Sequence, residues 1–462
     1  MSDDRFRGYR GPTRELLERF GVGVWSEVEM ATSRGDFAGL ILPRSETSDE
    51  HHVVLKLSSG YNIGIRYDTV TGMTETGRRE AKYQIPEREF PVSPDKPRVK
   101  LFGTGGTIAS RLDYRTGAVI PAFTPGELYG SVPELADICN LETEKLFSVF
   151  SENMGPEQYV ILAERVGQAI REGYDGVMIG HGTDTMHHTA AALSFMVQNP
   201  PVPIVMVGSQ RSSDRPSSDA ARNLISAAWA AAHGPIAEVT VCMFGPTSDR
   251  YNLLHRGTRV RKMHSSYRST FRTLGDIPLA MVEDGTITPL KDDWRPRRKD
   301  RDVTVQAAFE ENVTLLYYYP GMHPDLVDAM VERGYKGIVI AGTGLGHVNR
   351  KIYPALERAR DAGVHVFMTL QTLWGFVQMQ VYETGREILG LGVIPLANML
   401  PEVAYIKLGW ALGLHPDDPA AVRALMTETV AGEMTEREPH DGYLILQGGV
   451  PEVQEFFGKV WK

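Results

Sequence analysis

The sequence Arg98-Val99-Lys100-Leu101-Phe102 is a short strand-like run, and the glycine-rich turn Gly103-Thr104-Gly105-Gly106-Thr107 follows it at once. The stretch Asp175-Gly176-Val177-Met178-Ile179-Gly180 has the same form, because His181-Gly182-Thr183-Asp184-Thr185-Met186 comes directly after it. Residues 156–171, between the two, have a helix-like pattern. Strands that are apolar on both faces and alternate with helices imply a parallel sheet covered by helices on both sides.

The same alternation continues on both sides of a charged stretch at residues 291–299. We expect further helices at residues 185–196 and 219–232, and further strands at residues 202–207, 239–244, 313–317, 337–341 and 364–368. The predicted fold class is therefore α/β, with a two-domain, doubly wound core of parallel sheets joined near the charged stretch.

The N-terminal part of the chain differs from this core. Between about residue 23 and residue 65, short strand-like runs alternate with turns rich in Ser, Asp and Gly, which predicts a small β-barrel. Residues 85–97 then contain four prolines in thirteen positions, a pattern typical of a linker. We therefore divide the chain into a small β-barrel module at 1–84, a linker at 85–97, α/β domains at 98–300 and 301–430, and a tail at 431–462.

Composition excludes several classes of protein. The 462 residues carry a net charge of −9, whereas a protein that binds nucleic acid strongly by itself is usually basic. No stretch reaches the about 18 apolar residues that a membrane helix needs, and the N-terminus does not resemble a secretion signal. The two cysteines, Cys139 and Cys242, offer neither a disulfide framework nor a metal-ligand spacing, so we expect a cytoplasmic protein.

The two glycine-rich turns are the candidate site. In open α/β sheets, ligands bind beyond the carboxyl ends of the strands, where both turns lie. Glycines let a substrate approach backbone N–H groups closely, and such groups can form an oxyanion hole. The first turn matches neither the dinucleotide motif nor a phosphate-binding loop with its lysine. One such turn alone could have a purely structural role, but two such turns in one sheet favour a ligand-binding or catalytic site.

Threonine is the candidate nucleophile, but its hydroxyl is weak until another group takes its proton. Asp184, next to Thr183, could take part, and so could Lys262, which we expect in a polar loop among other cations. A lone lysine is more often a solvated surface residue. Adjacent histidines, such as His187 with His188, have no further ligand at metal-binding spacing, so we expect no metal in this chain.

Taken together, the two turns closely resemble the signature motifs of bacterial-type L-asparaginases, over roughly residues 99–412. The resemblance implies an asparaginase-like core in which Thr107 is the primary nucleophile. It also implies that Thr183, Asp184 and Lys262 form the second catalytic group and that Tyr114 helps to activate the nucleophile. By the same resemblance, Ser151 and Glu152 bind the α-carboxylate and α-amine of the substrate, with Asp184 as a further ligand of the amine. Which threonine attacks is not decided by the residues themselves.

Plain asparaginases lack the N-terminal module, the linker and the loop at residues 208–219. These segments, with residues 381–386 and 400–405, resemble the D-subunit family of the archaeal glutamyl-tRNA(Gln) amidotransferase, from about residue 10 to about residue 448. That resemblance implies a glutaminase that passes ammonia to a partner, the E subunit, which holds the tRNA and uses ATP and Mg²⁺. It further implies a homodimer flanked by two partner subunits, with no cofactor in this chain.

Two other functions remain open at this point. A free-standing asparaginase or glutaminase would turn over fully without a partner. A non-catalytic assembly scaffold would not need Thr107, Thr183, Asp184 and Lys262, and their presence argues against it. Glutamine and asparagine differ by one methylene, a difference that a pocket discriminates by only about 1–3 kcal/mol.

Overall fold

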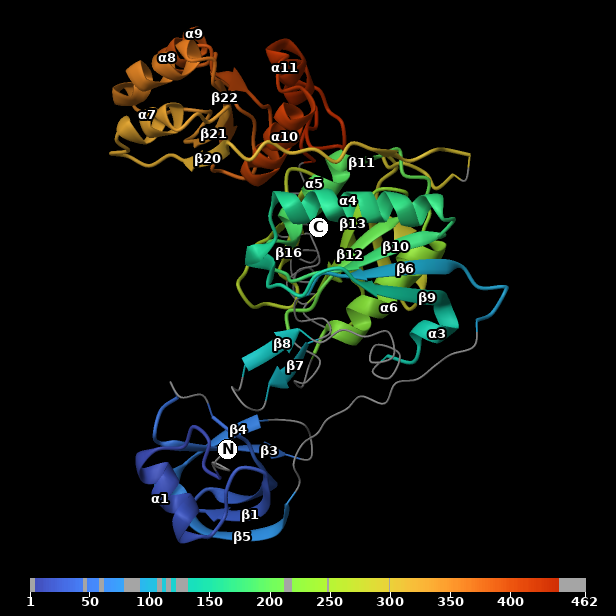
Figure 1. Ribbon diagram of the computed structural model, residues 1–462, viewed down its shortest axis with the longest axis vertical. Helices are drawn as coiled ribbons and strands as arrows, with labels where there is room; N and C mark the ends of the chain where they lie inside the picture. The colour runs from blue at the N-terminus through green and yellow to red at the C-terminus, as the bar shows by residue number, and fades with distance from the viewer. Residues whose placement is uncertain are drawn as a thin grey trace, which may run out of the picture.

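The computed structural model of the chain describes residues 5–44, 48–57, 62–78, 92–105, 110–113, 118–121, 132–211, 218–246, 249–298 and 300–439. These residues form an N-terminal β module, a large α/β part and a smaller C-terminal α/β part (Figure 1). No helix of the described residues is long and apolar enough to cross a membrane.

The N-terminal module is an antiparallel sheet with the order β4-β3-β2-β1-β5. Its elements are α1 (Gly11–Arg19), β1 (Ser26–Thr32), β2 (Gly35–Ile41), β3 (His52–Leu57), β4 (Asn62–Arg66), the 3-10 turn η1 (Tyr67–Thr69) and β5 (Val70–Arg78). Alternate strand residues such as Val28, Met30, Val53 and Leu55 are buried in its own core. The predicted barrel is not confirmed, because β4 and β5 are edge strands and no ladder joins them among the described residues.

An eight-stranded sheet forms the centre of the large α/β part. In spatial order its strands are β18 (Thr286–Pro289), β17 (Ala280–Glu283), β14 (Asn252–Arg256), β13 (Val239–Phe244), β12 (Ile204–Val207), β10 (Gly176–Gly180), β6 (Arg98–Gly103) and β9 (Asn140–Lys145). The strands from β13 to β9 are parallel, and β14, β17 and β18 are antiparallel. The predicted purely parallel sheet is therefore wrong at this edge.

Short connections explain the antiparallel edge. Parallel neighbours need a crossover of a dozen or more residues, whereas only residues 245–251 separate β13 from β14. The turn between β17 and β18 is Asp284-Gly285, and both residues have positive φ, 46° and 83°. Asp-Gly with this backbone is a strong hairpin signal. The strands predicted from the sequence did not include this hairpin.

Helices cover both faces of this sheet, as predicted (Figure 1). The helices α4 (Pro156–Arg171) and α5 (Met186–Met196) lie on one face, and α3 (Leu135–Ile138) and α6 (Ala220–His233) on the other. The remaining elements of this part are η3 (Ser151–Asn153) and three small ladders, β7 (Ser110–Asp113) with β8 (Ala118–Pro121), β11 (Val197–Gln198) with β19 (Thr304–Val305), and β15 (Val260–Lys262) with β16 (Phe271–Thr273).

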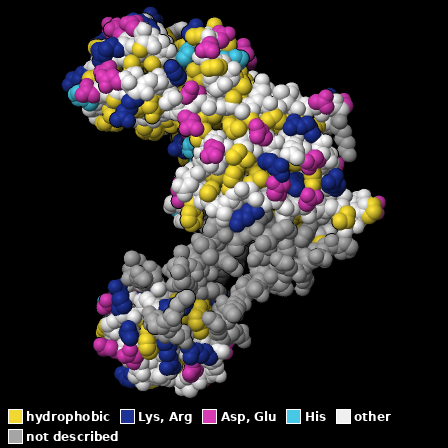
Figure 2. Space-filling model, in the orientation of Figure 1, with side chains coloured by type: hydrophobic (Ala, Val, Ile, Leu, Met, Phe, Trp, Pro, Cys, Tyr) yellow, Lys and Arg dark blue, Asp and Glu magenta, His cyan; other side chains and the backbone are white. Residues whose placement is uncertain are grey.

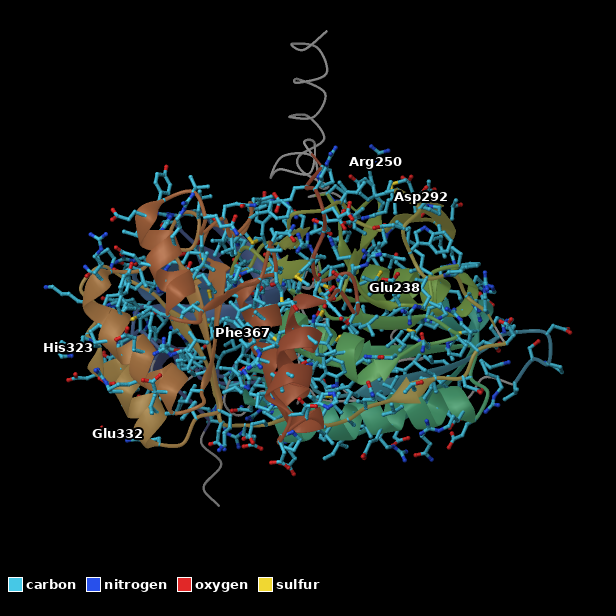
Figure 3. The ribbon with its side chains drawn as sticks, turned by 90° about the horizontal axis from the view of Figure 1, so that it is seen from above. Glu238, Arg250, Asp292, His323, Glu332 and Phe367 are labelled. Atoms are coloured by element: carbon cyan, nitrogen blue, oxygen red, sulfur yellow. The ribbon has the colours of Figure 1, made fainter. Side chains whose placement is uncertain are left out.

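The C-terminal part contains a parallel sheet of β20 (Val313–Tyr317), β21 (Gly337–Gly342), β22 (His365–Leu370) and β23 (Ile394–Pro395). Around it lie α7 (Asp325–Glu332), η4 (Arg350–Ile352), α8 (Tyr353–Asp361), α9 (Glu383–Gly390), α10 (Pro401–Leu414) and α11 (Pro419–Thr427). Phe367 is inside this part, whereas His323 and Glu332 lie on its outer side (Figure 3).

The two α/β parts share one apolar core. Trp410 of α10 stacks on Phe195 of α5 with ring centroids 5.5 Å apart, and its indole N–H donates to the carbonyl of Gln306 at 3.0 Å. After α11, residues 428–439 return to the large part, and we call this segment the strap. The carbonyl of Ala431 in the strap accepts a hydrogen bond from the Thr258 hydroxyl at 2.8 Å.

Candidate active site

The structure brings the two glycine-rich turns together at the carboxyl ends of neighbouring strands. Gly103, the last residue of β6, pairs in register with Gly180, the last residue of β10. Thr104 then donates both its backbone N–H and its hydroxyl to the Gly180 carbonyl, each at 3.0 Å. Two turns about 77 residues apart in sequence therefore form one polar edge, as the parallel pattern predicts.

Thr183, Asp184 and Lys262 meet at this edge. The Lys262 amine donates to the Thr183 hydroxyl at 2.9 Å and to Asp184 Oδ1 at 2.6 Å. The Lys262 side chain is 9% exposed and that of Asp184 is 68% exposed, so the carboxylate faces solvent while the amine is sheltered. The predicted polar loop around Lys262 is wrong: the residue ends β15, a strand paired with β16.

His181 holds the second turn in shape. Its Nδ1 lies 2.6 Å from the Gly182 carbonyl, so Nδ1 carries the proton and donates. Its Nε2, 2.9 Å from the Thr189 hydroxyl, then accepts a hydrogen bond from that hydroxyl. Burial lowers the pKa of His181 to about 4, which keeps the ring neutral near pH 7.

Ser151 lies against the same turn. A side chain at Gly182 would place its Cβ only 2.8 Å from the Ser151 Cβ and 3.0 Å from its hydroxyl. The Thr185 hydroxyl also donates to the Ser151 carbonyl. Ser151 is buried and Glu152 is exposed on the 3-10 turn η3, so Ser151 of the predicted substrate-binding pair contacts the turn that contains Thr183 and Asp184.

Two predicted site residues, Thr107 and Tyr114, lie outside the described residues. The chain is described up to Gly105, whose φ of +119° and whose Cβ position, 2.2 Å from the Val149 carbonyl oxygen, require glycine. Val149 in turn donates its N–H to the Thr104 carbonyl at 3.2 Å. The start of the first turn is therefore fixed on the segment that leads to Ser151.

Comparison with known proteins agrees with this geometry. Family models match the chain as "Asparaginase, N-terminal" at residues 98–295, "Glutaminase/Asparaginase C-terminal domain" at residues 312–426 and "GatD N-terminal domain" at residues 23–72. The chain is 50% identical over 439 residues to the glutamyl-tRNA(Gln) amidotransferase D subunit of Thermococcus kodakarensis, covering 93% of this chain and 98% of that protein. It is 47% identical to the D subunit of Methanopyrus kandleri, covering 92% and 94%. This chain belongs to the D-subunit family of glutamyl-tRNA(Gln) amidotransferases.

Solved structures agree with an asparaginase-like core in this D-subunit family member. The thermostable L-asparaginase of Thermococcus kodakarensis has a TM-score of 0.64 at 32% identity, covering 73% of this chain and 99% of that one. L-asparaginase I of Vibrio cholerae has a TM-score of 0.63 at 28% identity, covering 74% and 99%. Both resemblances stated from the sequence are thus confirmed.

Asp219 holds the start of the loop after β12, a role that its place in the sequence does not indicate. In this D-subunit family member its carboxylate accepts hydrogen bonds from the backbone N–H groups of Gln210 and Arg211, at 3.0 Å and 2.9 Å, and from the Asn223 amide at 2.9 Å. Burial raises the pKa of Asp219, and these hydrogen bonds oppose that rise. In the sequence it is only the end of the loop at 208–219, because hydrogen bonds to residues eight and nine positions earlier follow neither the helix nor the strand period.

Among the described residues, no three His, Cys, Asp or Glu side chains are grouped so that they could hold a metal ion. His187 and His188 stack with ring centroids 4.4 Å apart. Burial lowers the pKa of both rings, that of His188 to about 4. Both rings are therefore neutral near pH 7.

Proposed function

We propose that this chain is the glutaminase subunit of a tRNA-dependent amidotransferase that converts Glu-tRNA(Gln) to Gln-tRNA(Gln). It hydrolyses the side-chain amide of glutamine and supplies ammonia to a partner subunit. The observation that carries this proposal is the Lys262 amine held 2.9 Å from the Thr183 hydroxyl and 2.6 Å from Asp184, at the carboxyl edge of the sheet. Membership of the D-subunit family supports the choice of reaction.

The chemistry needs a hydroxyl that loses its proton as it attacks. The threonine oxygen bonds to the amide carbon, the C–N bond breaks, and nitrogen leaves as ammonia with the proton that the hydroxyl gives up. Water then cleaves the ester and releases glutamate. The Lys262 amine takes the proton from Thr183 and delivers it to the leaving nitrogen, and Asp184 holds the amine in place, as in a Ser-Lys arrangement. The family resemblance assigns the first attack to Thr107, assisted by Tyr114.

Substrate binding follows from the exposed carboxylates around this group. Asp184 and Glu152 both face solvent, and either can accept hydrogen bonds from the α-ammonium of an amino acid. The Ser151 hydroxyl, beside Gly182, can donate to the α-carboxylate. We assign these three side chains to recognition of the α-carbon end of glutamine.

The partner supplies the rest of the reaction in this proposal. The E subunit holds Glu-tRNA(Gln) and uses ATP and Mg²⁺, so this chain needs no cofactor. The net charge of −9 and the mixing of acidic and basic side chains over the face shown in Figure 2 support leaving tRNA mainly to the partner. We assign a homodimer core within an α2β2 complex in the cytoplasm. The N-terminal module docks on the partner, and a complex that still forms without residues 1–95 would remove that role.

Ammonia release from glutamine and from asparagine tests the function. We expect slow release by the chain alone, and a sharp, glutamine-selective rise once Glu-tRNA(Gln) is added together with the E subunit. Brisk release by the chain alone, preferring asparagine and indifferent to tRNA, would instead identify a free-standing asparaginase, the activity named for the similar solved structures.

Substitution of Lys262 tests the site. Lys262→Met should reduce ammonia release by about 10²–10⁴-fold, the usual contribution of a general base. Lys100→Met is the matched control. The Lys100 side chain is as sheltered as that of Lys262, at 10% exposed, and its amine likewise lies close to a carboxylate, 2.8 Å from Glu142. Lys100 differs in that it lies within strand β6, before the site. Equal activity of the two variants would overturn the assignment, and undiminished release by Thr183→Val and Lys262→Met would mean that the mechanism is wrong. No release by the unmodified chain, even with the E subunit and Glu-tRNA(Gln), would instead support the scaffold.

A further inference from the structure

The strand that carries Lys262 is too short to position the lysine by itself. β15 contains three residues, and among the described residues its ladder is with the three residues of β16 alone. An isolated two-stranded ladder has little stability of its own. Val260, at its start, is fully buried in the shared core, but the direction of the Lys262 side chain depends on what else holds this strand.

Arg261, the neighbour of Lys262, provides one anchor. Its guanidinium donates to Glu402 Oε2 at 3.2 Å. Glu402 lies in the first turn of α10 and its side chain is 5% exposed, whereas that of Arg261 is 31% exposed. The pair therefore ties the strand of the large α/β part to a helix of the C-terminal part. Because successive side chains leave a strand on opposite sides, this anchor restrains the strand without blocking Lys262.

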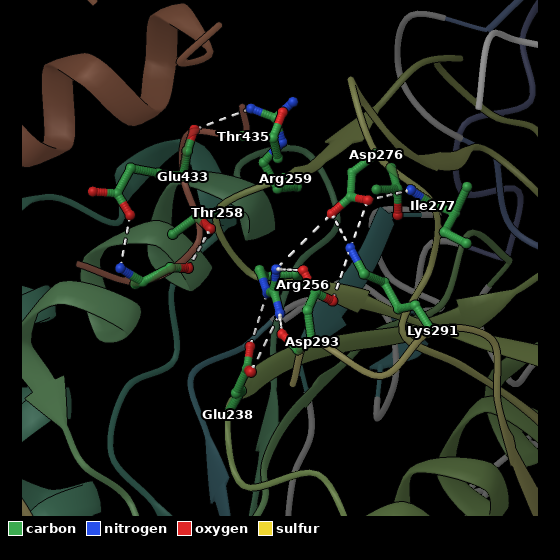
Figure 4. A network of polar contacts seen from close by, with 12 residues as sticks. Glu238, Arg256, Thr258, Arg259, Asp276, Ile277, Lys291, Asp293, Glu433 and Thr435 are labelled. Carbon is green, nitrogen blue, oxygen red and sulfur yellow. Dashed lines mark hydrogen bonds and ion pairs between the residues drawn. The ribbon is translucent and has the colours of Figure 1, made fainter. Parts of the chain in front are cut away.

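Arg259, the residue directly before β15, provides a second anchor. Its side chain is fully buried and donates to the carbonyl of Asn398 at 2.8 Å and to that of Glu433 at 3.0 Å. Asn398 precedes α10 and Glu433 belongs to the strap, so both acceptors again lie outside the large part. Figure 4 shows Arg259 reaching toward Glu433 and Thr435 of the strap.

Glu402 is an unusual residue to bury unless it has such a task. Burial raises its pKa, and the charge of Arg261 acts in the opposite direction. Its Oε1 is buried without a hydrogen-bond partner among the described residues. A half-satisfied buried carboxylate costs stability and is weak evidence of a purely stabilising role. His187 and His188, the histidines on the side of α5, are held neutral and offer it no opposite charge.

We propose that Glu402 is a positioning residue for Lys262, and that it acts through Arg261. The C-terminal part thereby sets the direction of the lysine amine toward Thr183 across the boundary between the two α/β parts. This inference rests on the proposed function, because it assumes that Lys262 acts in the reaction. As a consequence, a movement of α10 changes kcat, the rate of the chemical step, more than it changes the binding of glutamine.

The test measures kcat and KM for glutamine with the full chain in complex with Glu-tRNA(Gln) and the E subunit. A lysine displaced by about 1 Å costs up to about 10²-fold in rate. We expect Glu402→Gln and Arg261→Met each to reduce kcat by about 10- to 100-fold with KM within about twofold. Arg261 is partly exposed, so Arg261→Met remains informative if Glu402→Gln fails to fold. Arg261→Lys, which keeps the charge, should recover part of the loss.

Two combinations show whether the effect passes through Arg261 and Lys262. The double variant Glu402→Gln/Arg261→Met should lose no more than either single variant, since residues that act as a unit are not additive. Glu402→Gln should add nothing in a Lys262→Met background. Losses that multiply in either combination would overturn the proposal. Lys262→Met with full activity would instead defeat the proposed mechanism itself, so the two failures are distinguishable.

Glu238→Gln is the matched control for a broken ion pair. Its carboxylate accepts from Arg256 at 2.9 Å, with side chains 17% and 7% exposed, in the polar network of Figure 4 that does not include Lys262. We expect its kcat to stay within about twofold of the unmodified complex. A fall in kcat equal to that of Glu402→Gln would mean that any broken buried pair slows the reaction, and the positioning role would be lost.

Discussion

Replacing Lys407 by methionine should destabilise the protein more than any exposed charge change. The Lys407 ammonium in α10 lies 2.5 Å from Glu433 Oε1 in the strap, and both side chains are 0% exposed. In the variant the Glu433 carboxylate would keep its hydrogen bonds from the N–H groups of Val430 and Ala431, at 3.0 Å and 2.7 Å, but would lose its counter-charge. Breaking one partner of such a pair costs about 3–5 kcal/mol.

Thermal unfolding measures this loss. At about 2–4 °C per kcal/mol for a cooperative unit of 150–250 residues, the midpoint should fall by about 6–20 °C. The double variant Lys407→Met/Glu433→Met should recover more than half of the loss, because apolar replacement of a whole buried pair is often neutral. A protease at low concentration should cleave the strap faster in Lys407→Met than in the unmodified protein, and the double variant should not show this increase.

Arg350→Met is the matched control for the loss of a cation. Arg350 makes a 2.8 Å pair with Glu387, but the two side chains are 57% and 35% exposed, so the expected cost is about 0–1 kcal/mol. If Lys407→Met lowered the midpoint no more than Arg350→Met, the buried pair would not hold the strap in place. The reasoning would then be refuted, and the other strap contacts would have to carry that role.

Three further predictions concern the site and the cores. Gly182→Ala should raise the KM for glutamine about tenfold, because its Cβ would lie 2.8 Å from that of Ser151; an unchanged KM in steady-state assays would contradict this contact. His181→Gln should make the loss of stability in acid less steep, by up to about 1.4 kcal/mol per pH unit between about pH 6.5 and pH 4. In the folded protein the His181 ring has a pKa of about 4 and stays neutral over this range, whereas in the unfolded chain it binds a proton. Urea unfolding at several pH values measures this slope, and parallel curves for the two proteins would exclude it. Burial raises the pKa of Cys139 to about 12 and that of Cys242 further, so iodoacetamide should label both thiols only after unfolding; mass spectrometry that finds a labelled native thiol would disprove this.

Much of the α/β core was predictable because its signals are local. The strand before each glycine-rich turn is apolar on both faces, and the helix predicted at residues 156–171 begins and ends where α4 does. Prediction failed where a short connection decided the pairing direction, as between β13 and β14, and where closure of a sheet depends on its edges, as in the N-terminal module. Helix α1 and strand β5 of that module were also not predicted.

What the sequence determined by itself was the set of chemical groups and their place at strand ends. Thr183 and Asp184 follow β10 directly, and parallel strands place such turns at one edge of a sheet whatever the distant residues do. The glycine at position 105 also has a positive φ of 119°, a local backbone conformation that favours glycine.

Only the tertiary structure decided which distant side chains meet Thr183 and Asp184. Lys262 reaches Thr183 across 79 residues, and Glu402 reaches Arg261 across 141. No periodicity or turn propensity encodes such pairs, because they depend on how two sheets and the helix α10 pack against each other. Their short contacts and burial arise from the fold as a whole, which is why a lysine expected in an open loop lies instead on a strand held by another part of the chain.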